Sequence, residues 1–369
     1  MALNTVSSDR LSTNVKNTNF TAAEKQDLTD DILPLAGQLG NRNLIINGAM
    51  QVAQRGTSST SSGYQTVDRF KSNFTGLDNS PTMAQVDVAS GTTPYTQGFR
   101  KAFKVTNGNQ SSGAGAGDQF SISYLVEDQD LATSGWNYLS ATSYVTLSFW
   151  FKSSVNQSFY VVIESKDGSS KQYSFIMTPT AADTWTKVTH SIKGNSGLQF
   201  SNDNGEGIEI YFLLFYGTNQ TTSGHTLNTW KATSASDQAP DMTSTWYTTN
   251  TATWEMTGLQ LEVGSVATDF EHLSFADELV RCQRYYQLID YYANTGSASN
   301  AFIYAANISY YQQMRASPTM TSSSRGSNTG TASPSAWSNG GYINETHCSI
   351  TVGSATHAFV GRAKLDAEL

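Results

Sequence analysis

Short segments in which hydrophobic and polar residues alternate follow one another from residue 41 to residue 273. The stretch GLQLEVG at residues 258–264 shows the pattern, because the apolar Leu259, Leu261 and Val263 alternate with the polar Gln260 and Glu262. A period of two is typical of strands that bury one face. Glycine, asparagine, aspartate and serine separate the segments, as turns require. We therefore expect strands within residues 44–48, 64–74, 100–108, 119–128, 144–154, 157–168, 171–178, 184–194, 207–217 and 252–264.

Two of these segments, residues 145–151 and 208–216, are largely apolar on both faces. Such strands belong at the centre of a two-sheet structure in which both faces are covered. About ten strands without a helical pattern between them imply antiparallel sheets packed face to face. The pattern predicts a mainly β protein whose larger part, residues 41–273, is a jelly-roll sandwich.

A helical pattern follows the last long strand. Ser274 with Asp277 three residues later is a start signal, and the pattern continues to about Tyr292. The residues alone allow an amphipathic helix packed on its own sandwich or a coiled-coil seam between copies of the chain. The seam would be too short to associate by itself. Its a/d positions, spaced by four, three, four and three, are Phe275, Leu279, Cys282, Tyr286 and Ile289.

The two ends of the chain differ from the middle. Four further strand-like segments after the helix predict a smaller β module, so that residues 274–369 form a helix plus this module. Residues 1–40 are polar with sparse apolar positions, and a capping box at Thr21–Glu24 predicts one short helix that Pro34 ends. This segment has too few apolar residues to fold alone. It is either a disordered tail or a segment that anchors the chain to a partner.

Composition narrows the function classes. Charged residues make up 14% of the chain, below the roughly 25% of ordinary soluble domains, while aromatic residues reach 11%. This balance fits a β-rich virion or extracellular surface and not a disordered chain. The net charge of -8 and the lack of a basic run argue against nucleic-acid binding. We expect no membrane insertion, no signal peptide and no disulfide, with Cys282 and Cys348 as free buried thiols.

The sequence offers little catalytic chemistry. Its five histidines are scattered, with no zinc-binding pair, nucleophile elbow or phosphate-binding loop, so we expect no cofactor and no catalysis. Glu127, Asp128 and Asp130 could include a hydrolase pair, but a solvated strand end is favoured. The turn SNDNGEG at residues 201–207 is either a hairpin turn or a weak calcium site. The candidate calcium ligands are Asp203, Asn204 and Glu206.

Aromatic residues in polar surroundings are candidates for sugar contact. Sugar sites combine flat aromatic faces with amides and carboxylates. Trp150, Trp185 and Trp254 lie in predicted strands, where a core role is expected. The remaining candidates could form a small cluster beneath a loop or contact a ligand. As ligand-binding residues the sequence indicates Trp230, Trp246, Tyr247 and Trp337.

Five motifs together resemble a family of bacteriophage and prophage tail proteins, the tail fibres and related appendages that carry a carbohydrate-binding-like jelly roll. They are NRNLIINGAMQVAQRG at 41–56, VDRF at 67–70, GLQLEVGSVATDFEHLSFADELVRCQRYYQ at 258–287, MRASPTMT at 314–321 and DAEL at 366–369. The resemblance implies a homotrimer in the virion and contact with host-surface glycans. It also favours three helices around a shared axis over a helix packed on its own sandwich.

We therefore expect a virion appendage protein of the tail-fibre type, made in the host cytoplasm. Residues 1–40 would attach it to other tail or head proteins, and the remainder would recognise a host-surface glycan or protein receptor without catalysis. The alternative is a purely structural tail adaptor or capsid decoration protein that binds only other virion subunits. A surface polysaccharide hydrolase is the third alternative.

Overall fold

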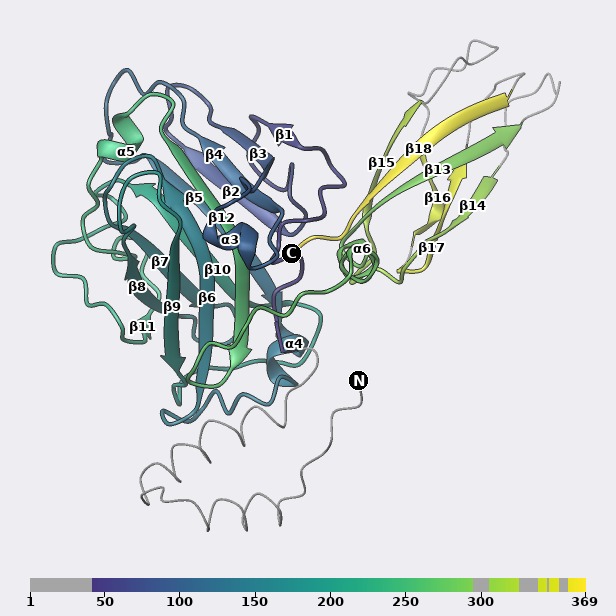
Figure 1. Ribbon diagram of the computed structural model, residues 1–369. Helices are drawn as coiled ribbons and strands as arrows, with labels where there is room; N and C mark the ends of the chain where they lie inside the picture. The colour runs from purple at the N-terminus through teal and green to yellow at the C-terminus, as the bar shows by residue number, and fades with distance from the viewer. Residues whose placement is uncertain (1–41, 295–304, 325–337, 344, 352–357) are drawn as a thin grey trace, which may run out of the picture. The chain divides into compact units, whose positions relative to one another are not determined.

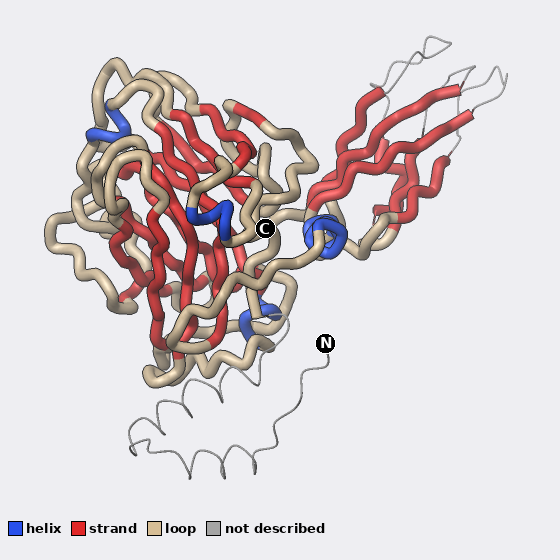
Figure 2. Tube along the Cα trace, in the orientation of Figure 1, coloured by secondary structure: helices blue, strands red, loops and turns tan. Residues whose placement is uncertain are grey.

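The computed structural model describes residues 42–294, 305–324, 338–343, 345–351 and 358–369. Asn43–Leu369 form one compact unit, distinct from Met1–Arg42. Strands dominate the described residues, and the helices among them are short (Figure 2). None of these helices is long and apolar enough to cross a membrane. Trp337, one of the predicted ligand-binding residues, lies outside the described residues.

Two six-stranded antiparallel sheets make up the larger part of this unit (Figure 1). Sheet A has the order β1-β3-β4-β12-β6-β9, and sheet B has the order β11-β8-β7-β10-β5-β2. Consecutive strands pass repeatedly from one sheet to the other, so the mainly β, jelly-roll prediction is confirmed. The strands of sheet A are β1 Ser58–Ser59, β3 Thr82–Asp87, β4 Lys101–Thr106, β6 Tyr144–Ser153, β9 Thr186–Lys193 and β12 Thr253–Val263. Those of sheet B are β2 Phe70–Thr75, β5 Gln119–Glu127, β7 Phe159–Ser165, β8 Lys171–Met177, β10 Glu206–Tyr216 and β11 Lys231–Ala232.

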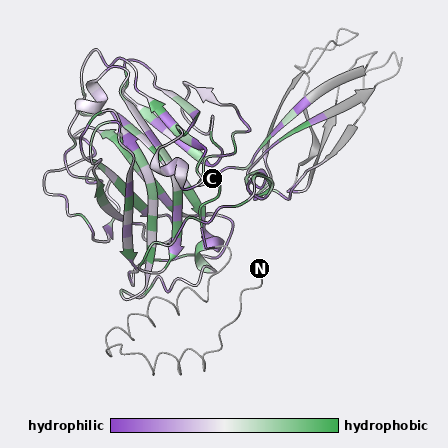
Figure 3. Ribbon diagram, viewed as in Figure 1, coloured by the Kyte–Doolittle hydropathy of each residue, from purple (hydrophilic) through white to green (hydrophobic). Residues whose placement is uncertain are grey.

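The core of the sandwich consists of aromatic and aliphatic side chains that meet between the two sheets. Phe149 of sheet A and Phe212 of sheet B contact edge to face with ring centroids 5.2 Å apart, and Trp254 lies 6.1 Å from the same Phe212 ring. Aromatic pairs of this geometry add to the free energy gained from burial. Hydrophobic positions are concentrated in these strands (Figure 3). The two largely apolar segments form β6 and β10, which both lie inside their sheets, as predicted.

The first expected strand, residues 44–48, does not form, and residues 46–49 make a turn instead. Asn47 has a φ of 63°, outside the range of a regular strand, and its buried amide donates to the carbonyls of Val52 and Asp68. Asn47 Oδ1 in turn accepts the backbone N–H of Val52. Gly48 packs so closely that an added side-chain carbon would lie 2.1 Å from the Leu259 carbonyl oxygen. This turn is held by a side-chain amide, which alternation of polarity does not reveal.

Helix α6 spans Phe275–Gln283, and its predicted start is confirmed because Ser274 Oγ accepts the backbone N–H of Asp277. The predicted end near Tyr292 is wrong. Residues Tyr286–Asn294 form strand β13, which pairs along its whole length with β18, Ala358–Asp366. A nine-residue ladder to the C-terminal strand satisfies the backbone better here than a longer helix, and tyrosine and isoleucine suit a strand.

Because the helix is shorter than predicted, the five residues of the predicted coiled-coil seam do not lie along one helix. Phe275, Leu279 and Cys282 lie on α6, whereas Tyr286 and Ile289 lie on β13. Phe275 is 55% exposed, while Cys282, Tyr286 and Ile289 are all buried within one chain. The a/d spacing therefore joins residues that belong to two elements with different surroundings.

Residues beyond α6 form two three-stranded antiparallel sheets, ordered β13-β18-β15 and β14-β17-β16, which we call the distal module. Their remaining strands are β14 Ala305–Ser309, β15 Thr319–Ser324, β16 Ser338–Ile343 and β17 His347–Thr351. Three very short helices interrupt the sandwich connections, namely α3 Thr93–Thr96, α4 Asp128–Ala132 and α5 Thr245–Thr248. A small module of strands after the helix was expected from the sequence, and these sheets supply it.

Candidate functional site

The outer face of sheet B carries polar side chains across five neighbouring strands. Residues that alternate with core positions point away from the sandwich interior, as a strand requires. The pairing register places Lys71 of β2 opposite Ser123 of β5, Ser123 opposite Tyr211 of β10, and Tyr211 opposite Val162 of β7. These four side chains therefore form a row across the strands. The next row contains Glu209 of β10, Glu164 of β7 and Gln172 of β8.

Two adjoining pockets open on this face, and we call them together the sheet B groove. One has a volume of about 360 Å³ and reaches from Lys71 to Gln172, with the connection after β11 as a wall. The other has a volume of about 310 Å³ and lies along β2, between residues 71–75 and the preceding connection at Ser62 and Gly63. They share Lys71, Asn73 and Gln119, so the two pockets form one continuous groove.

One end of the groove holds a compact network of charged and phenolic groups. Lys166 Nζ lies 2.7 Å from a carboxylate oxygen of Glu164 and 2.7 Å from one of Glu209. The Tyr211 hydroxyl donates to Glu209 and accepts from Lys166 at 3.1 Å. Burial alone would lower the pKa of Lys166, but the Glu209 charge and the hydrogen bonds to both carboxylates raise it. Burial and the neighbouring Glu209 also raise the pKa of Tyr211, which keeps the phenol protonated.

The other end of the groove is cationic and rich in amides. Lys71, Asn73 and Gln119 are half-buried where the two pockets meet. Asn73 Nδ2 donates to Ser123 Oγ at 2.9 Å, which fixes the amide against the strand. Lys71 Nζ lies 5.7 Å from the centre of the Tyr64 ring. This half therefore presents an ammonium group and amides, whereas the other half presents two carboxylates.

The wall of the groove is tied to the sheet by hydrogen bonds. Gln172 Nε2 donates to the Asp237 carbonyl at 2.5 Å, and Gln172 Oε1 accepts the backbone N–H of Ser234. Tyr216 donates to Ser121 Oγ at 3.1 Å beneath the same connection. A groove held in this way exists before a ligand arrives, so binding loses less conformational entropy.

A Ser–His–Asp arrangement lies beneath this wall. It was not expected from the sequence, in which the histidines are scattered. Ser174 Oγ lies 2.5 Å from His225 Nε2, and His225 Nδ1 lies 2.7 Å from Asp237 Oδ1. The order matches a hydrolase triad. However, Ser174 is 2% exposed and the His225 side chain is fully buried, so no substrate reaches the hydroxyl in this structure. Lys231 also pairs with Asp237 at 2.6 Å, and the cluster fastens the wall to β8.

Three of the predicted sugar-contacting aromatics are in the wrong place for that role. Trp246 and Tyr247 are fully buried in the sandwich core, and Trp230 is buried as well. Their polar atoms are used internally. Trp246 Nε1 donates to the Thr253 carbonyl, the Tyr247 hydroxyl donates to Asp118, and Trp230 Nε1 donates to the Lys193 carbonyl. Polar neighbours in the sequence therefore belong to connections that cover these rings.

The predicted calcium turn joins β9 of sheet A to β10 of sheet B, so it is not a hairpin turn, and it contacts the distal module. Asp203 Oδ1 accepts the Gly205 N–H at 2.7 Å, and Asn204 Nδ2 donates to the Arg315 carbonyl at 2.6 Å. Glu206 is exposed. Within the described ranges no group of three or more acidic, histidine or cysteine side chains is placed to hold a metal ion. The calcium prediction thus finds no support in the side chains of this turn.

The acidic strand end at Glu127 and Asp128 is buried and not solvated, which corrects the favoured sequence interpretation. Glu127 makes a two-pronged contact with Arg284, at 3.0 Å from Nε and 2.9 Å from Nη2. Burial and the charge of Asp167 raise the pKa of Asp128 to about 6. Alternation of polarity could not reveal this, because Arg284 follows Glu127 by more than 150 residues.

Residues of several sequence motifs meet at the same junction between the sandwich and the distal module. Arg69 of VDRF is buried and pairs with Glu368 of DAEL, while its guanidinium lies 3.4 Å from the centre of the Tyr285 ring. Arg55 pairs with Asp366 at 3.0 Å and with Glu368 at 3.3 Å. Burial raises the pKa of Asp68 to about 6, although Gln54 and Arg55 act against the rise. The charged residues of these motifs therefore pair with one another in a buried polar junction.

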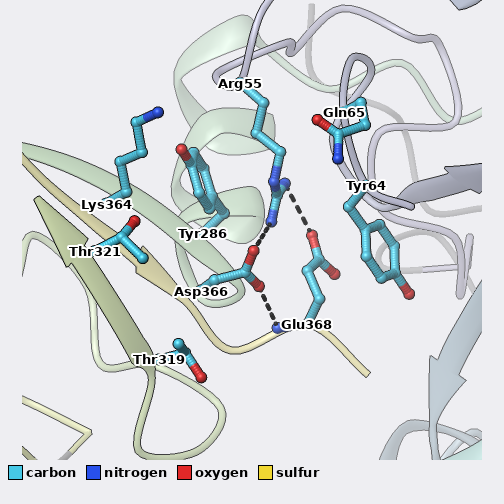
Figure 4. A pocket seen from close by; sticks show the side chains of 9 residues that line it. All are labelled: Arg55, Tyr64, Gln65, Tyr286, Thr319, Thr321, Lys364, Asp366 and Glu368. Carbon is cyan, nitrogen blue, oxygen red and sulfur yellow. Dashed lines mark hydrogen bonds and ion pairs between the residues drawn. The ribbon is translucent and has the colours of Figure 1, made fainter. Parts of the chain in front are cut away.

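A pocket of about 510 Å³ opens at this junction (Figure 4). Figure 4 shows the Arg55 guanidinium directed at Asp366 and Glu368, and it lies 3.7 Å from the centre of the Tyr286 ring. The Tyr64 hydroxyl donates to the Leu369 carbonyl at 3.1 Å. The polar groups of this pocket are largely engaged with one another, which marks them as parts of the junction.

Comparison with known proteins gives weak structural likenesses only. A scan against family models and a search of curated proteins find no match. The enzymatically active domain of tailspike protein 4 of bacteriophage CBA120 is similar over 60% of this chain and 21% of that chain, with 10% identity and a TM-score of 0.32. A family 11 carbohydrate-binding module of a Clostridium thermocellum cellulase is similar over 59% and 98%, with 12% identity and a TM-score of 0.28. The module TmCBM61 in complex with β-1,4-galactotriose is similar over 61% and 100%, with 11% identity and a TM-score of 0.27. Likenesses of this strength transfer neither ligand nor activity.

Proposed function

We propose that this chain is a glycan-binding protein of a bacteriophage tail appendage, and that the sheet B groove is its sugar site. The observation that carries the proposal is the composition of that groove. Its larger pocket is lined by two tyrosines, two carboxylates, four amides and the ammonium group of Lys71, and the neighbouring Lys166 pairs with both carboxylates. Sugar hydroxyls both donate and accept hydrogen bonds, so they fit a surface that offers acceptors and donors side by side.

The proposed binding is non-catalytic, and Lys166 supplies the reason. Glu164 and Glu209 both contact its ammonium group, so their carboxylates lie close together. Retaining glycosidases also use two neighbouring carboxylates, which lie roughly 5 to 5.5 Å apart. In a hydrolase, the scissile bond lies between the two carboxylates. Here Lys166 Nζ contacts one oxygen of each carboxylate, which supports a non-catalytic role. The pair is therefore suited to accept hydrogen bonds from hydroxyl groups.

Attachment to the particle and association of copies complete the proposal. Residues 1–40 would anchor the chain to other virion proteins, and the described unit would face the host surface as a homotrimer. Helix α6 buries Glu278 and Cys282 but leaves Phe275 and Val280 55% and 48% exposed, which supports an interface on its outer face. Linked copies multiply a weak single-site affinity.

A structural adaptor that binds only virion subunits is the second candidate. It is favoured by the position of many tail-protein motif residues at the buried junction, away from the groove. Adsorption to host cells separates the two candidates, because an adaptor would bind particles and no host surface.

The test uses the full chain on a glycan array and on host cells. Glu209→Gln removes one charge from the groove network, and Glu206→Gln on the same strand, at an exposed position, is its matched control. We expect Glu209→Gln to weaken binding about tenfold or more, because a hydrogen bond to a charged group is lost, and Glu206→Gln to bind like the wild type. No binding of the wild type to any glycan or host cell would overturn the proposal. Release of reducing sugar from host polysaccharide would indicate a hydrolase instead.

A further inference from the structure

The charges of the sheet B groove are divided between its two ends. At the β7–β10 end, the ammonium group of Lys166 is shared by Glu164 and Glu209. At the β2–β5 end, Lys71 is the charged group that lines both pockets. The β2 and β10 strands flank β5, so they are separated by two strand spacings, or about 10 Å. Lys71 is thus distant from the acidic network.

Lys71 has no carboxylate partner among the residues that the structure describes. Its recorded neighbour is the Tyr64 ring, 5.7 Å away. By contrast, Lys166, at the other end of the groove, contacts the carboxylates of Glu164 and Glu209. Asn73 lies two residues further along the same face of β2, and Gln119 belongs to the same stretch of both pockets. A cation flanked by two amides is a donor-rich position, and its natural counterpart is an anionic oxygen group.

From this placement we infer that the bound glycan carries an anionic group, a carboxylate, sulfate or phosphate on one of its sugars, and that Lys71 binds it. The inference rests on the proposed function and adds the chemical class of the ligand. Neutral hydroxyl groups of the same glycan would lie over Tyr211, Glu209 and Glu164. The bound stretch therefore spans several sugar units, with its charged unit near β2 and its neutral units towards β7.

The test compares charged and neutral forms of the same oligosaccharides. The probes are uronate- and nonulosonate-bearing oligosaccharides with their carboxyl-reduced counterparts, and sulfated and phosphorylated oligosaccharides with their unesterified counterparts. Affinity is measured for the full-length wild type, Lys71→Met, Lys71→Arg, and Lys187→Met as a control at an exposed position on sheet A. We expect the wild type to prefer the charged member of at least one pair, and Lys71→Met to lose that preference by about ten- to hundredfold.

Lys71→Arg should keep most of the preference, and Lys187→Met should keep all of it. The pair that shows the effect identifies the anion as carboxylate, sulfate or phosphate. Equal binding of both members of every pair, or an unchanged preference in Lys71→Met, would overturn the inference while the proposed glycan binding stands. Absence of binding to every probe and to host cells would overturn both.

Discussion

Glu368 is the penultimate residue of the chain, and no local pattern indicates that its carboxylate is buried. It pairs with Arg69 and Arg55, whose side chains are 1% and 7% exposed. Arg69 also donates to the Leu125 carbonyl at 2.6 Å. Removing one partner of a buried ion pair leaves the other charge without compensation, which costs far more than the loss of a surface pair.

Glu368→Ala is therefore expected to lower the free energy of unfolding by about 3 to 5 kcal/mol. Asp87→Ala breaks the exposed pair with Lys101 and should change it by no more than about 1 kcal/mol. Urea denaturation of the two variants measures the difference. If both variants lost the same amount of unfolding free energy, breaking the Arg69–Glu368 pair would not leave a costly unpaired charge, and the prediction would be wrong.

Residue roles were the hardest feature to predict from the sequence, because burial depends on partners far along the chain. Trp246 and Tyr247 stand among polar residues, yet Gln157, Thr253 and Asp118 supply their hydrogen bonds and permit full burial. Trp254, in contrast, was correctly expected in the core, since strand alternation is a local property. No sequence motif marks the groove residues Lys71, Glu209 and Tyr211. Only the register in which their strands pair brings them together on one face.

At the scale of elements, local signals predicted where the helix begins better than where it ends. The Ser274 cap is encoded within four residues and was predicted correctly. Helix α6 ends where it does because the following residues, Tyr286–Asn294, pair with β18 as a strand. Strand β18 lies more than seventy residues further along the chain. A helical spacing of apolar residues cannot show this competition. The remaining helix turns Glu278 inward and the apolar Phe275 and Val280 outward.

The outer face of α6 should be an interface between copies of the chain. Phe275→Ser combined with Val280→Ser is expected to convert the proposed trimer into a monomer on light scattering, because exposed apolar side chains gain free energy mainly when a partner covers them. The fold of each chain should persist, since neither side chain is buried within it. Leu139→Ser, at another exposed apolar position, is the control and should leave the oligomer intact. A trimer that survives the double substitution would place the interface elsewhere.

At the scale of the whole molecule, the fold class was predictable and the division of roles was not. Period-two alternation over more than 200 residues predicted a β-sandwich, and the sequence also indicated a strand at the position of β18. Strand β13, where a helix was expected, and its pairing with β18 came only from the structure. Three arginines of the sequence motifs, Arg55, Arg69 and Arg284, link the sandwich to residues of α6 and the distal module through ion pairs. The groove proposed for the ligand is separate from those contacts.

This division leads to a prediction for the N-terminal segment. Deletion of residues 1–40 removes none of the described core, because Asn43–Leu369 form a compact unit with their own buried cluster. The shortened chain is expected to remain folded and to bind host glycan with unchanged affinity, but to be missing from purified particles. The full-length Glu209→Gln variant should behave in the opposite way, joining particles normally while host adsorption falls. Quantitative immunoblotting of purified virions and a cell adsorption assay measure the two properties. Normal incorporation of the shortened chain would show that another part of the protein attaches it to the particle.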